Sequence, residues 1–315
     1  MVVGRRLRRG SVLSFFSGLP ATLIALEACS TAHYWARELV ALGHEVRLVP
    51  PRDVKAYVRG NKTDAADAAA LCEAVRRVGV SVVPIKSAAQ QAVLVLHRAR
   101  ELVVRQRTMA ANALRGHLAE FGIVAAQGRA GLHQLMAGLG RLSLPEEARF
   151  ALELVAAQWR ALDEKIVALE RRIVAWHKGN EPSRRLAGIP GVGPITATAL
   201  VASVGDPKAF KTGRHFAAWL GLTPREWSSG LKRRRGGISK RGDGYLRRLL
   251  ILGAHAVMRQ LGRRAMPGPR DPWLSALRQR RPSAVVAVAL ANKMARIAWV
   301  VMARGETYHH RPVAA

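Results

Sequence analysis

The chain has 315 residues, and its 51 Lys and Arg against 21 Asp and Glu give a formal net charge of +30. Apolar residues make up 49% of it, which excludes global disorder and suffices for about two domains with cores of their own. Its two cysteines, Cys29 and Cys72, exclude both a disulfide framework and a cysteine-based zinc site. Because so basic a chain repels itself unless a polyanion neutralises it, nucleic acid is the expected partner.

The first 28 residues partly follow the pattern of a secretory signal. Residues 1–10 are basic, and an uncharged run extends over residues 11–26. Gly18 and Pro20 interrupt that run, and Glu27 is a poor residue beside a cleavage site. We therefore expect no export and no membrane partner. The reduced thiols that two lone cysteines suggest are typical of the cytoplasm.

The region from residue 22 to residue 85 predicts an α/β domain. Residues 22–28 read as a buried strand, residues 32–42 as a helix with Ser30 and Thr31 as candidate N-caps, and residues 45–49 as a second strand. A strand, a helix and a strand in this order predict a parallel pair. A helix over residues 64–77 and a short strand over residues 80–85 are expected next.

Three carboxylates in this region could serve phosphodiester chemistry, in which several acids converge on Mg²⁺ ions. Glu27 lies at the carboxyl end of the first strand, where α/β sheets place their sites. Asp64 and Asp67, three residues apart at a helix start, project from one face. The simpler interpretation of either Asp alone is a favourable charge at a helix N-terminus.

The middle of the chain predicts long helices. Residues 88–121 have a helical pattern with a basic outer face, and a glycine-rich stretch at 122–140 ends it. The next helix alternates apolar spacings of three and four, the pattern of a coiled-coil seam. The seam consists of Leu152, Val155, Trp159, Leu162, Ile166, Leu169, Ile173 and Trp176. Its partner is either the helix over 88–121 or another subunit, and an ordinary amphipathic core helix is the alternative.

Residues 184–210 predict two helices joined by a tight turn, Ile-Pro-Gly-Val-Gly-Pro at 189–194. Gly191 and Gly193 would let backbone N–H groups approach a phosphate, and the N-terminus of the second helix adds positive potential. The pattern resembles a helix-hairpin-helix, a clamp for the DNA backbone. The alternative is a purely structural pair of helices.

Residues 224–250 form the basic centre of the chain, with nine Lys or Arg and two acids. Ser228, Ser229 and Gly230 lie inside it. A serine hydroxyl needs a base or an electrostatic clamp to act as a nucleophile, and a phosphodiester is the electrophile that Arg side chains hold best. The predicted nucleic-acid contacts are Arg225, Lys232, Arg233, Arg234, Arg235, Lys240 and Arg241. The alternative is a solvated basic loop with a Ser-Ser-Gly turn.

The last predicted helix covers residues 282–303 and follows a proline-rich loop at 266–272. Its residues are apolar nearly all round. Such a helix is expected in a core and not at a functional site.

Several motifs, taken in chain order, together resemble one family. They are Glu27, the segment Lys-Thr-Asp-Ala-Ala-Asp-Ala at 62–68, the turn at 189–194, and the serines with Ile-Ser-Lys-Arg-Gly-Asp-Gly-Tyr at 238–245. The family is the DEDD insertion-sequence transposases, the bridge-RNA-guided serine recombinases of bacteria and archaea. The resemblance covers essentially the whole chain. It implies an α/β plus α fold: an RNase H-like (resolvase-like) domain over 1–87, a helical coiled coil over 88–180, and a mainly helical transposase domain over 181–315.

The resemblance also implies roles for particular residues. Glu27, Asp64 and Asp67 match the second, third and fourth acids of the family's Mg²⁺ site. The nucleophile matches Ser229 better than Ser228, with a one-residue ambiguity because Leu231 separates Gly230 from the following lysine. The family's first Asp lies on a strand upstream of the Glu. Residues 1–26 contain no Asp or Glu, so the resemblance implies an N-terminally truncated domain.

The implied activity is transposition and DNA recombination, in which Ser229 attacks a DNA phosphodiester and a guide RNA made by the element selects the DNA. A homo-oligomer of two or four copies is expected. The alternative, favoured by the missing Asp, is a catalytically impaired nucleic-acid-binding remnant. A helix-hairpin-helix glycosylase is a third candidate, but Asp206, directly before Pro207 at a helix end, is a poor match to the catalytic Asp of such enzymes.

Overall fold

The computed structural model describes residues 5–58, 63–77, 79–124, 126, 128–230, 232, 234–263 and 272–309. The chain forms two compact units, residues 1–91 and residues 92–315. Helix α5 (Ala88–Ala119) begins in the first unit and continues into the second. The predicted subdivision of the second unit at residue 180 stays a prediction.

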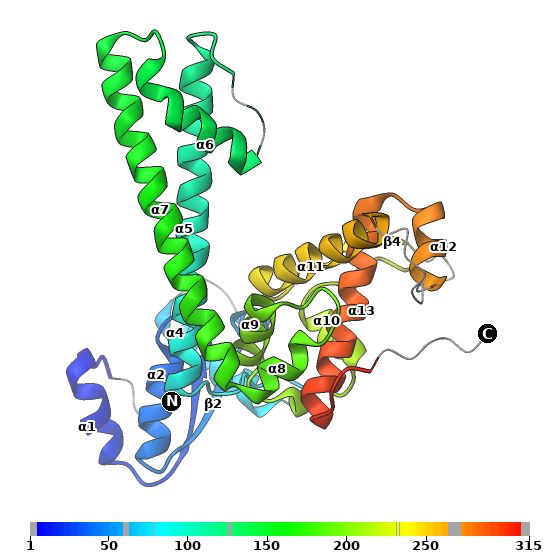
Figure 1. The fold of residues 1–315 in the computed structure, drawn as a ribbon. Coiled ribbons are helices and arrows are strands. Elements are labelled where there is room, and N and C mark those ends of the chain that lie inside the picture. The colour runs from blue at the N-terminus through cyan, green and yellow to red at the C-terminus, as the bar shows by residue number, and fades with distance from the viewer. Residues whose placement is uncertain are drawn as a thin grey trace. The chain divides into compact units, whose positions relative to one another are not determined.

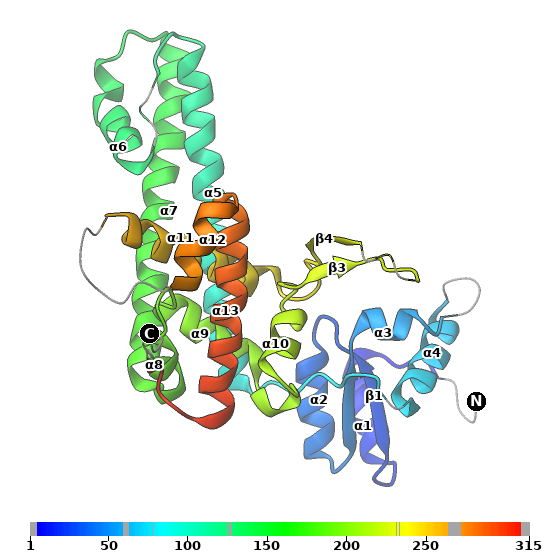
Figure 2. The ribbon, with the colours of Figure 1, turned by 90° about the vertical axis from the view of Figure 1, so that its right-hand side faces the viewer.

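The first unit is built on a parallel pair of strands, as the sequence predicted. Strand β1 (Leu23–Glu27), helix α2 (Ala32–Ala41) and strand β2 (Glu45–Val49) follow one another, and Leu23 pairs with Glu45 at one end and Glu27 with Val49 at the other. Neighbouring side chains on a strand point to opposite faces of the sheet. Leu48 accordingly packs with α2, and Val49 packs with α3 (Pro51–Lys55) and α4 (Asp64–Arg76). Figure 2 shows the strands between α2 and α4.

Two local predictions for this unit were wrong. Residues 80–85 do not form a strand: Val83 makes one antiparallel bridge, in which its N–H donates to the Leu48 carbonyl oxygen at 2.8 Å. In the described part of this unit the sheet therefore has two strands. Thr31 lies at the start of α2 with φ of 69°, but its hydroxyl accepts no capping hydrogen bond.

The uncharged N-terminal run is folded into the first unit. It contains the short helices η1 (Arg9–Ser11) and α1 (Val12–Ser17). His44 Nδ1 accepts a hydrogen bond from the Thr22 N–H at 3.3 Å, so the proton is on Nε2, which lies 3.0 Å from the Phe16 carbonyl oxygen. This buried histidine thereby attaches α1 to the turn before β2.

The second unit begins with two long helices, α5 and α7 (Glu146–Gly179), with α6 (Gly128–Gly138) and η2 (Leu139–Arg141) between them in the chain. Figures 1 and 2 show α5 and α7 side by side. Ion pairs join Arg100 to Glu170 and Arg107 to Asp163, so the helices run antiparallel. The predicted seam is buried at Leu152, Trp159, Leu162, Ile166 and Ile173 and half-buried at its other positions. Its partner is thus α5 of the same chain.

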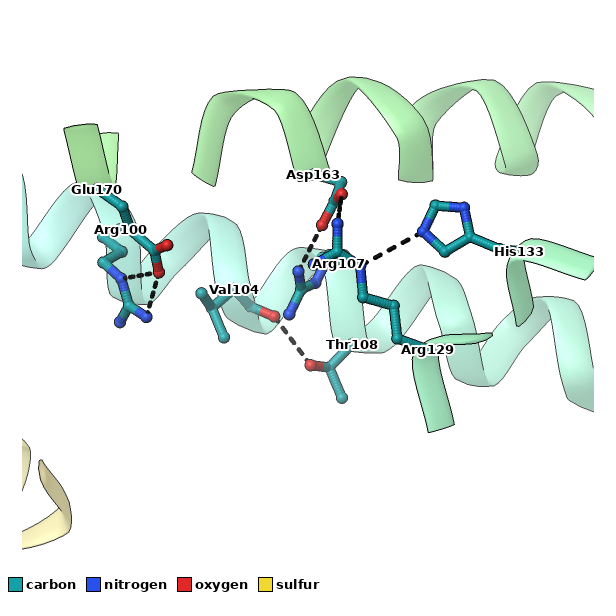
Figure 3. Close-up of polar contacts among 8 residues, drawn as sticks. All are labelled: Arg100, Val104, Arg107, Thr108, Arg129, His133, Asp163 and Glu170. Carbon is teal, nitrogen blue, oxygen red and sulfur yellow. Dashed lines mark hydrogen bonds and ion pairs between the residues drawn. The ribbon is translucent and has the colours of Figure 1, made fainter. Parts of the chain in front are cut away.

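A polar cluster crosses the seam (Figure 3). The largely buried carboxylate of Asp163 accepts hydrogen bonds from Arg107, at 2.6 Å, and from Arg129. The guanidinium of Arg129 also contacts His133 Nε2 at 3.3 Å, and Arg100 pairs with Glu170 at 2.6 Å. Because Asp163 and Glu170 of α7 pair with arginines far away in sequence, on α5 and α6, these contacts hold the three helices in one register.

The rest of the second unit is a helical core around α13 (Ser283–Arg304), which packs on α8 (Glu181–Ala187), α10 (Gly213–Trp219), α11 (Gly244–Arg263) and α12 (Pro272–Arg280). Helix α9 (Pro194–Val204) and the turn η3 (Pro207–Ala209) complete it. Among the described helices, α13 is the one long and apolar enough to cross a membrane. One face of α13 is buried in the core, as predicted, but the other is not, and Val285 is half exposed.

Candidate active site and nucleic-acid interface

Glu27 lies at the carboxyl end of β1 and is exposed. Its register partner Val49 packs against the helices α3 and α4. Partners in a parallel pair point to the same face of the sheet, so Glu27 points to the face that α4 covers. The fold thus places this predicted acid on the α4 side.

Asp64 and Asp67 occupy the first turn of α4. Thr63 precedes them as a true N-cap, because its Oγ1 accepts a hydrogen bond from the Ala66 N–H at 3.2 Å. Asp67 is half-buried and shares the helix face of the buried residues Ala70 and Ala74, whereas Asp64 is exposed. A negative charge in a first turn is stabilised by the helix dipole, which is a sufficient structural reason for both residues.

The three acids do not fit a preassembled magnesium site. Over the residues that the structure describes, no three His, Cys, Asp or Glu side chains lie close enough together to hold a metal ion. Glu27, Asp64 and Asp67 therefore do not form a three-ligand group in this structure. Their metal-binding role stays a prediction.

The two predicted serines lie at the tip of a hairpin that the sequence did not predict. Strands β3 (Pro224–Glu226) and β4 (Arg235–Ile238) are antiparallel, and Figure 2 shows them projecting from the helices of the second unit. Ser229 exchanges two backbone hydrogen bonds with Lys232, at 3.3 and 3.2 Å, and Gly230 has φ of +54° at the turn. The alternation along an extended strand places the side chains of Ser228 and Ser229 on opposite faces.

Ser228 has a carboxylate partner on its own face of the hairpin. Its hydroxyl donates to Glu226 Oε1 at 2.8 Å. A hydroxyl bound to a potential base is the arrangement that activates a serine nucleophile. Sequence reasoning missed Glu226, although a spacing of two residues on a strand is the signal that would have found it. The structure thus gives Ser228 a potential base, whereas the argument for Ser229 is the sequence resemblance alone, and the choice between them stays a prediction.

The root of the hairpin is held by close backbone packing. The Lys240 N–H donates to the Gly221 carbonyl oxygen at 3.2 Å. Gly242 has φ of +92°, and a Cβ there would collide with the Trp219 carbonyl oxygen. Asp243 Oδ1 then accepts from the Tyr245 and Leu246 N–H groups at 2.8 and 3.0 Å and caps α11. The segment at 238–245 therefore positions the hairpin.

The predicted nucleic-acid contacts lie on this hairpin and on the loop that follows it. Arg233 lies outside the described residues. The other six are all exposed: Arg225, Lys232, Arg234, Arg235, Lys240 and Arg241. Six exposed cations on one hairpin and the loop after it repel one another, so a polyanion beside them is favourable.

The two glycines of the turn between α8 and α9 have different surroundings. Gly191, with φ of +84°, packs against α11 and α13, and a Cβ there would lie 2.8 Å from both the Gly253 carbonyl oxygen and Met294 Cε. Gly193 is exposed, and a Cβ there would meet no atom within 4 Å. The absence of a side chain at Gly191 is therefore required by helix packing, and the predicted backbone approach to a phosphate stays possible at Gly193.

A buried polar triad links α5, α9 and α11, and nothing in the sequence pattern indicated it. Fully buried His97 lies 3.0 Å from Thr198 Oγ1 through Nε2 and 2.9 Å from the Tyr245 hydroxyl through Nδ1. Because the Thr198 hydroxyl donates to the Pro194 carbonyl oxygen at 2.8 Å, it accepts from Nε2–H, and the Tyr245 hydroxyl donates to Nδ1. Burial and the nearby Arg100 guanidinium lower the pKa of His97 to about 4. Burial also raises the pKa of Tyr245.

Comparisons with known proteins indicate the family of the chain. A family model described as "Transposase IS116/IS110/IS902 family" matches residues 183–267, and a DEDD transposase model of the IS110 type matches residues 16–123. A probable family 20 transposase of Pseudomonas aeruginosa is 49% identical over 312 residues, 98% of this chain and 92% of that protein.

Two further relatives cover nearly the whole chain. A putative transposase of Sinorhizobium fredii is 46% identical over 98% of this chain and 79% of its own length. The transposase for insertion sequence element IS1328 of Yersinia enterocolitica is 38% identical over 96% of this chain and 90% of its own. Transposases act on DNA, which is the partner that the basic composition of the chain predicted. The chain belongs to the IS110/IS116 family of insertion-sequence transposases.

Proposed function

We propose that this transposase cuts and rejoins DNA through a serine hydroxyl at the tip of the β3–β4 hairpin, with Ser229 as the nucleophile. The observation that carries the proposal is the placement of both serines on a rigidly rooted, exposed hairpin rich in cations. The Oγ of Ser229 forms a bond to phosphorus while the bond from phosphorus to a deoxyribose oxygen breaks. The serine proton passes to a base, and the leaving oxygen gains a proton.

The surrounding residues supply what such a step requires. The exposed cations of the hairpin offset the charge of the attacked phosphate, as Arg and Lys clamps do in phosphoryl transfer. Glu226 accepts the hydrogen bond of the Ser228 hydroxyl, on the face opposite to Ser229, so it would be the proton acceptor if Ser228 were the nucleophile. The phosphoserine link conserves the energy of the broken bond, so the second strand can be joined by attack of its own hydroxyl.

The resemblance adds an RNA guide, an assembly of two or four copies and Mg²⁺ to the proposal. A net charge of +30 supports binding of a second nucleic acid beside the DNA. The proposed step assigns no role to a metal ion, because the carboxylates of the described residues do not form a three-ligand group. Omission of Mg²⁺ from the assay below tests that cofactor directly.

The test is covalent trapping of labelled DNA by the full chain in the presence of guide RNA and Mg²⁺. Ser229→Ala should abolish the adduct, and Ser228→Ala should reduce it without abolishing it, because one hydroxyl alone can lie in line with the leaving oxygen. Glu226→Gln keeps the side-chain size and should slow adduct formation if the carboxylate is the base. An adduct that survives in the double variant S228A/S229A would exclude serine chemistry.

A second candidate is a nucleic-acid-binding protein impaired in catalysis. The observation that favours it is that Glu27, Asp64 and Asp67 are not gathered into one group. This candidate predicts salt-sensitive DNA binding with no adduct under any metal condition, because its cations would still displace counterions from phosphates. The trapping experiment therefore separates the two.

A further inference from the structure

A large open groove lies beside the serine hairpin, within the second unit. Its volume is about 1530 Å³. The half of α13 that does not face the core forms the floor, which includes Val285, Val288, Ala289 and Val300, and the hairpin contributes Trp227 as a wall. Pockets for small molecules measure roughly 300–1,000 Å³. The groove is thus large enough for a segment of a polymer.

The charge of the groove indicates what kind of polymer it takes. Five cationic side chains line it, and none of its described lining residues is acidic. The cations are Arg214, Arg225, Lys240, Lys293 and Arg296. An apolar floor with a purely cationic rim complements a ligand that has flat apolar groups and a row of negative charges.

Trp227 offers a preorganised aromatic surface in this groove. Its backbone N–H donates to the Arg234 carbonyl oxygen at 2.9 Å, which fixes its position in the hairpin. The indole lies against Gly236, where a Cβ would come within 2.5 Å of the ring. The residue is nevertheless 59% exposed, so much of the side chain is open to a ligand.

We propose that the groove binds unpaired nucleotides of a nucleic acid strand, with bases on the apolar floor and against Trp227 and phosphates along the cationic rim. A duplex keeps its bases stacked inside and presents no apolar faces to such a floor, whereas unpaired bases stack on aromatic side chains. Trp227 directly precedes Ser228 and Ser229 in the chain. The groove therefore holds bases next to the serines. This rests on the proposed cutting and rejoining of DNA, in which bases beside a cut strand leave their old partners before pairing with new ones.

The test compares binding of a short oligothymidylate with binding of a duplex of equal length, by fluorescence anisotropy at fixed salt. Trp227→Ala should weaken oligothymidylate binding at least about fivefold and change duplex binding by less than about twofold, because stacking acts on exposed bases alone. Trp227→Phe should restore most of the loss. Equal losses on both ligands, or no loss on either, would overturn the proposal.

A second pair of variants keeps the test independent of the hairpin. Val285→Asp adds a negative charge to the groove floor, in the first turn of α13, where a carboxylate suits the helix dipole. Val95→Asp makes the same change on α5, outside the groove, at a position of similar exposure, 59% against 50%. Both variants add one negative charge, so V95D measures the effect of charge alone. V285D should weaken oligothymidylate binding more than V95D does. Equal effects of the two would count against the groove.

Other occupants give other results. If polyglutamate or vesicles of anionic lipid compete with oligothymidylate at equal charge concentration, and W227A weakens their binding equally, then the groove takes an acidic protein or a membrane and the proposal is wrong. Failure of the proposed serine chemistry and failure of the groove proposal give different results. An adduct in S228A/S229A would remove serine chemistry while leaving a W227A defect in single-strand binding intact. A normal W227A would remove the groove while leaving adduct formation by Ser229 intact.

Discussion

The His97–Thr198–Tyr245 triad predicts a specific sensitivity of this protein to acid. Folded His97 has a pKa of about 4, against 6.5 for an exposed imidazole. Above pH 6.5 the ring is neutral in both the folded and the unfolded chain, and no penalty arises. As the pH falls from 6.5 to 4, His97 binds a proton in the unfolded chain but not in the folded chain, so the folded state loses stability. The loss is complete near pH 4 and amounts to about 3 kcal/mol.

The variant His97→Gln isolates this effect. A Gln amide can donate to Thr198 and accept from Tyr245, as the neutral imidazole does, but it does not titrate. We expect H97Q to cost about 1 kcal/mol at pH 7.5, through imperfect geometry, and to unfold less readily than the native sequence near pH 4.5. His117→Gln, on the exposed side of the same helix, is the matched control and should keep the native acid sensitivity.

The measurement is urea unfolding at pH 7.5, 5.5 and 4.5, followed by tryptophan fluorescence. Other groups also titrate in this range, so the informative quantity is the difference between each variant and the native chain. If the free energy of unfolding of H97Q falls with pH as steeply as that of H117Q, then His97 does not carry the acid sensitivity, and the lowered pKa of the folded imidazole is wrong.

Three further predictions follow from single contacts. Gly191→Ala should cost about 2 kcal/mol or more by forcing α11 and α13 apart, whereas Gly193→Ala should change the stability by less than about 0.5 kcal/mol; equal effects in thermal unfolding would contradict the packing argument. Asp163→Asn should cost about 2 kcal/mol, because the half-buried Arg107 loses its counter-charge, and a variant as stable as the native chain in urea would show that water already screens the pair. Thr63→Ala should cost about 1 kcal/mol through loss of the α4 cap, and unchanged hydrogen-exchange protection at the start of α4 would refute the cap.

Several elements were determined by the local sequence alone. The β1–α2–β2 unit follows from two apolar runs around an amphipathic segment, and the buried seam of α7 follows from its alternating spacing of three and four. These predictions succeed because hydrophobic periodicity dictates which face of a segment leaves water, and that choice needs no knowledge of the partner. The order of short motifs also predicted the family, because a motif is a local pattern of residues that can be read without the fold.

Other features were decided only by contacts between distant residues. The sequence left the partner of α7 open between α5 and another subunit, and the pairing of Asp163 with Arg107 assigned it to α5. It indicated neither the His97–Tyr245 contact, which joins residues 148 positions apart, nor the packing of Gly191 on Gly253. A lone histidine or glycine looks the same in the sequence whether it is exposed or buried against a partner, because burial and partners come from the fold.

The functional site shows the same division. The sequence placed the two serines and the basic centre, but the hairpin was hidden, because its run of arginines and glycines lacks the alternation of a half-buried strand. The contact of Ser228 with Glu226 is local to that hairpin. Tertiary structure gave α13 a second face along a groove, and it did not bring the three predicted acids together over the described residues. The local sequence indicates candidate residues, and contacts between segments that are distant in the chain decide which of those from different segments come close together.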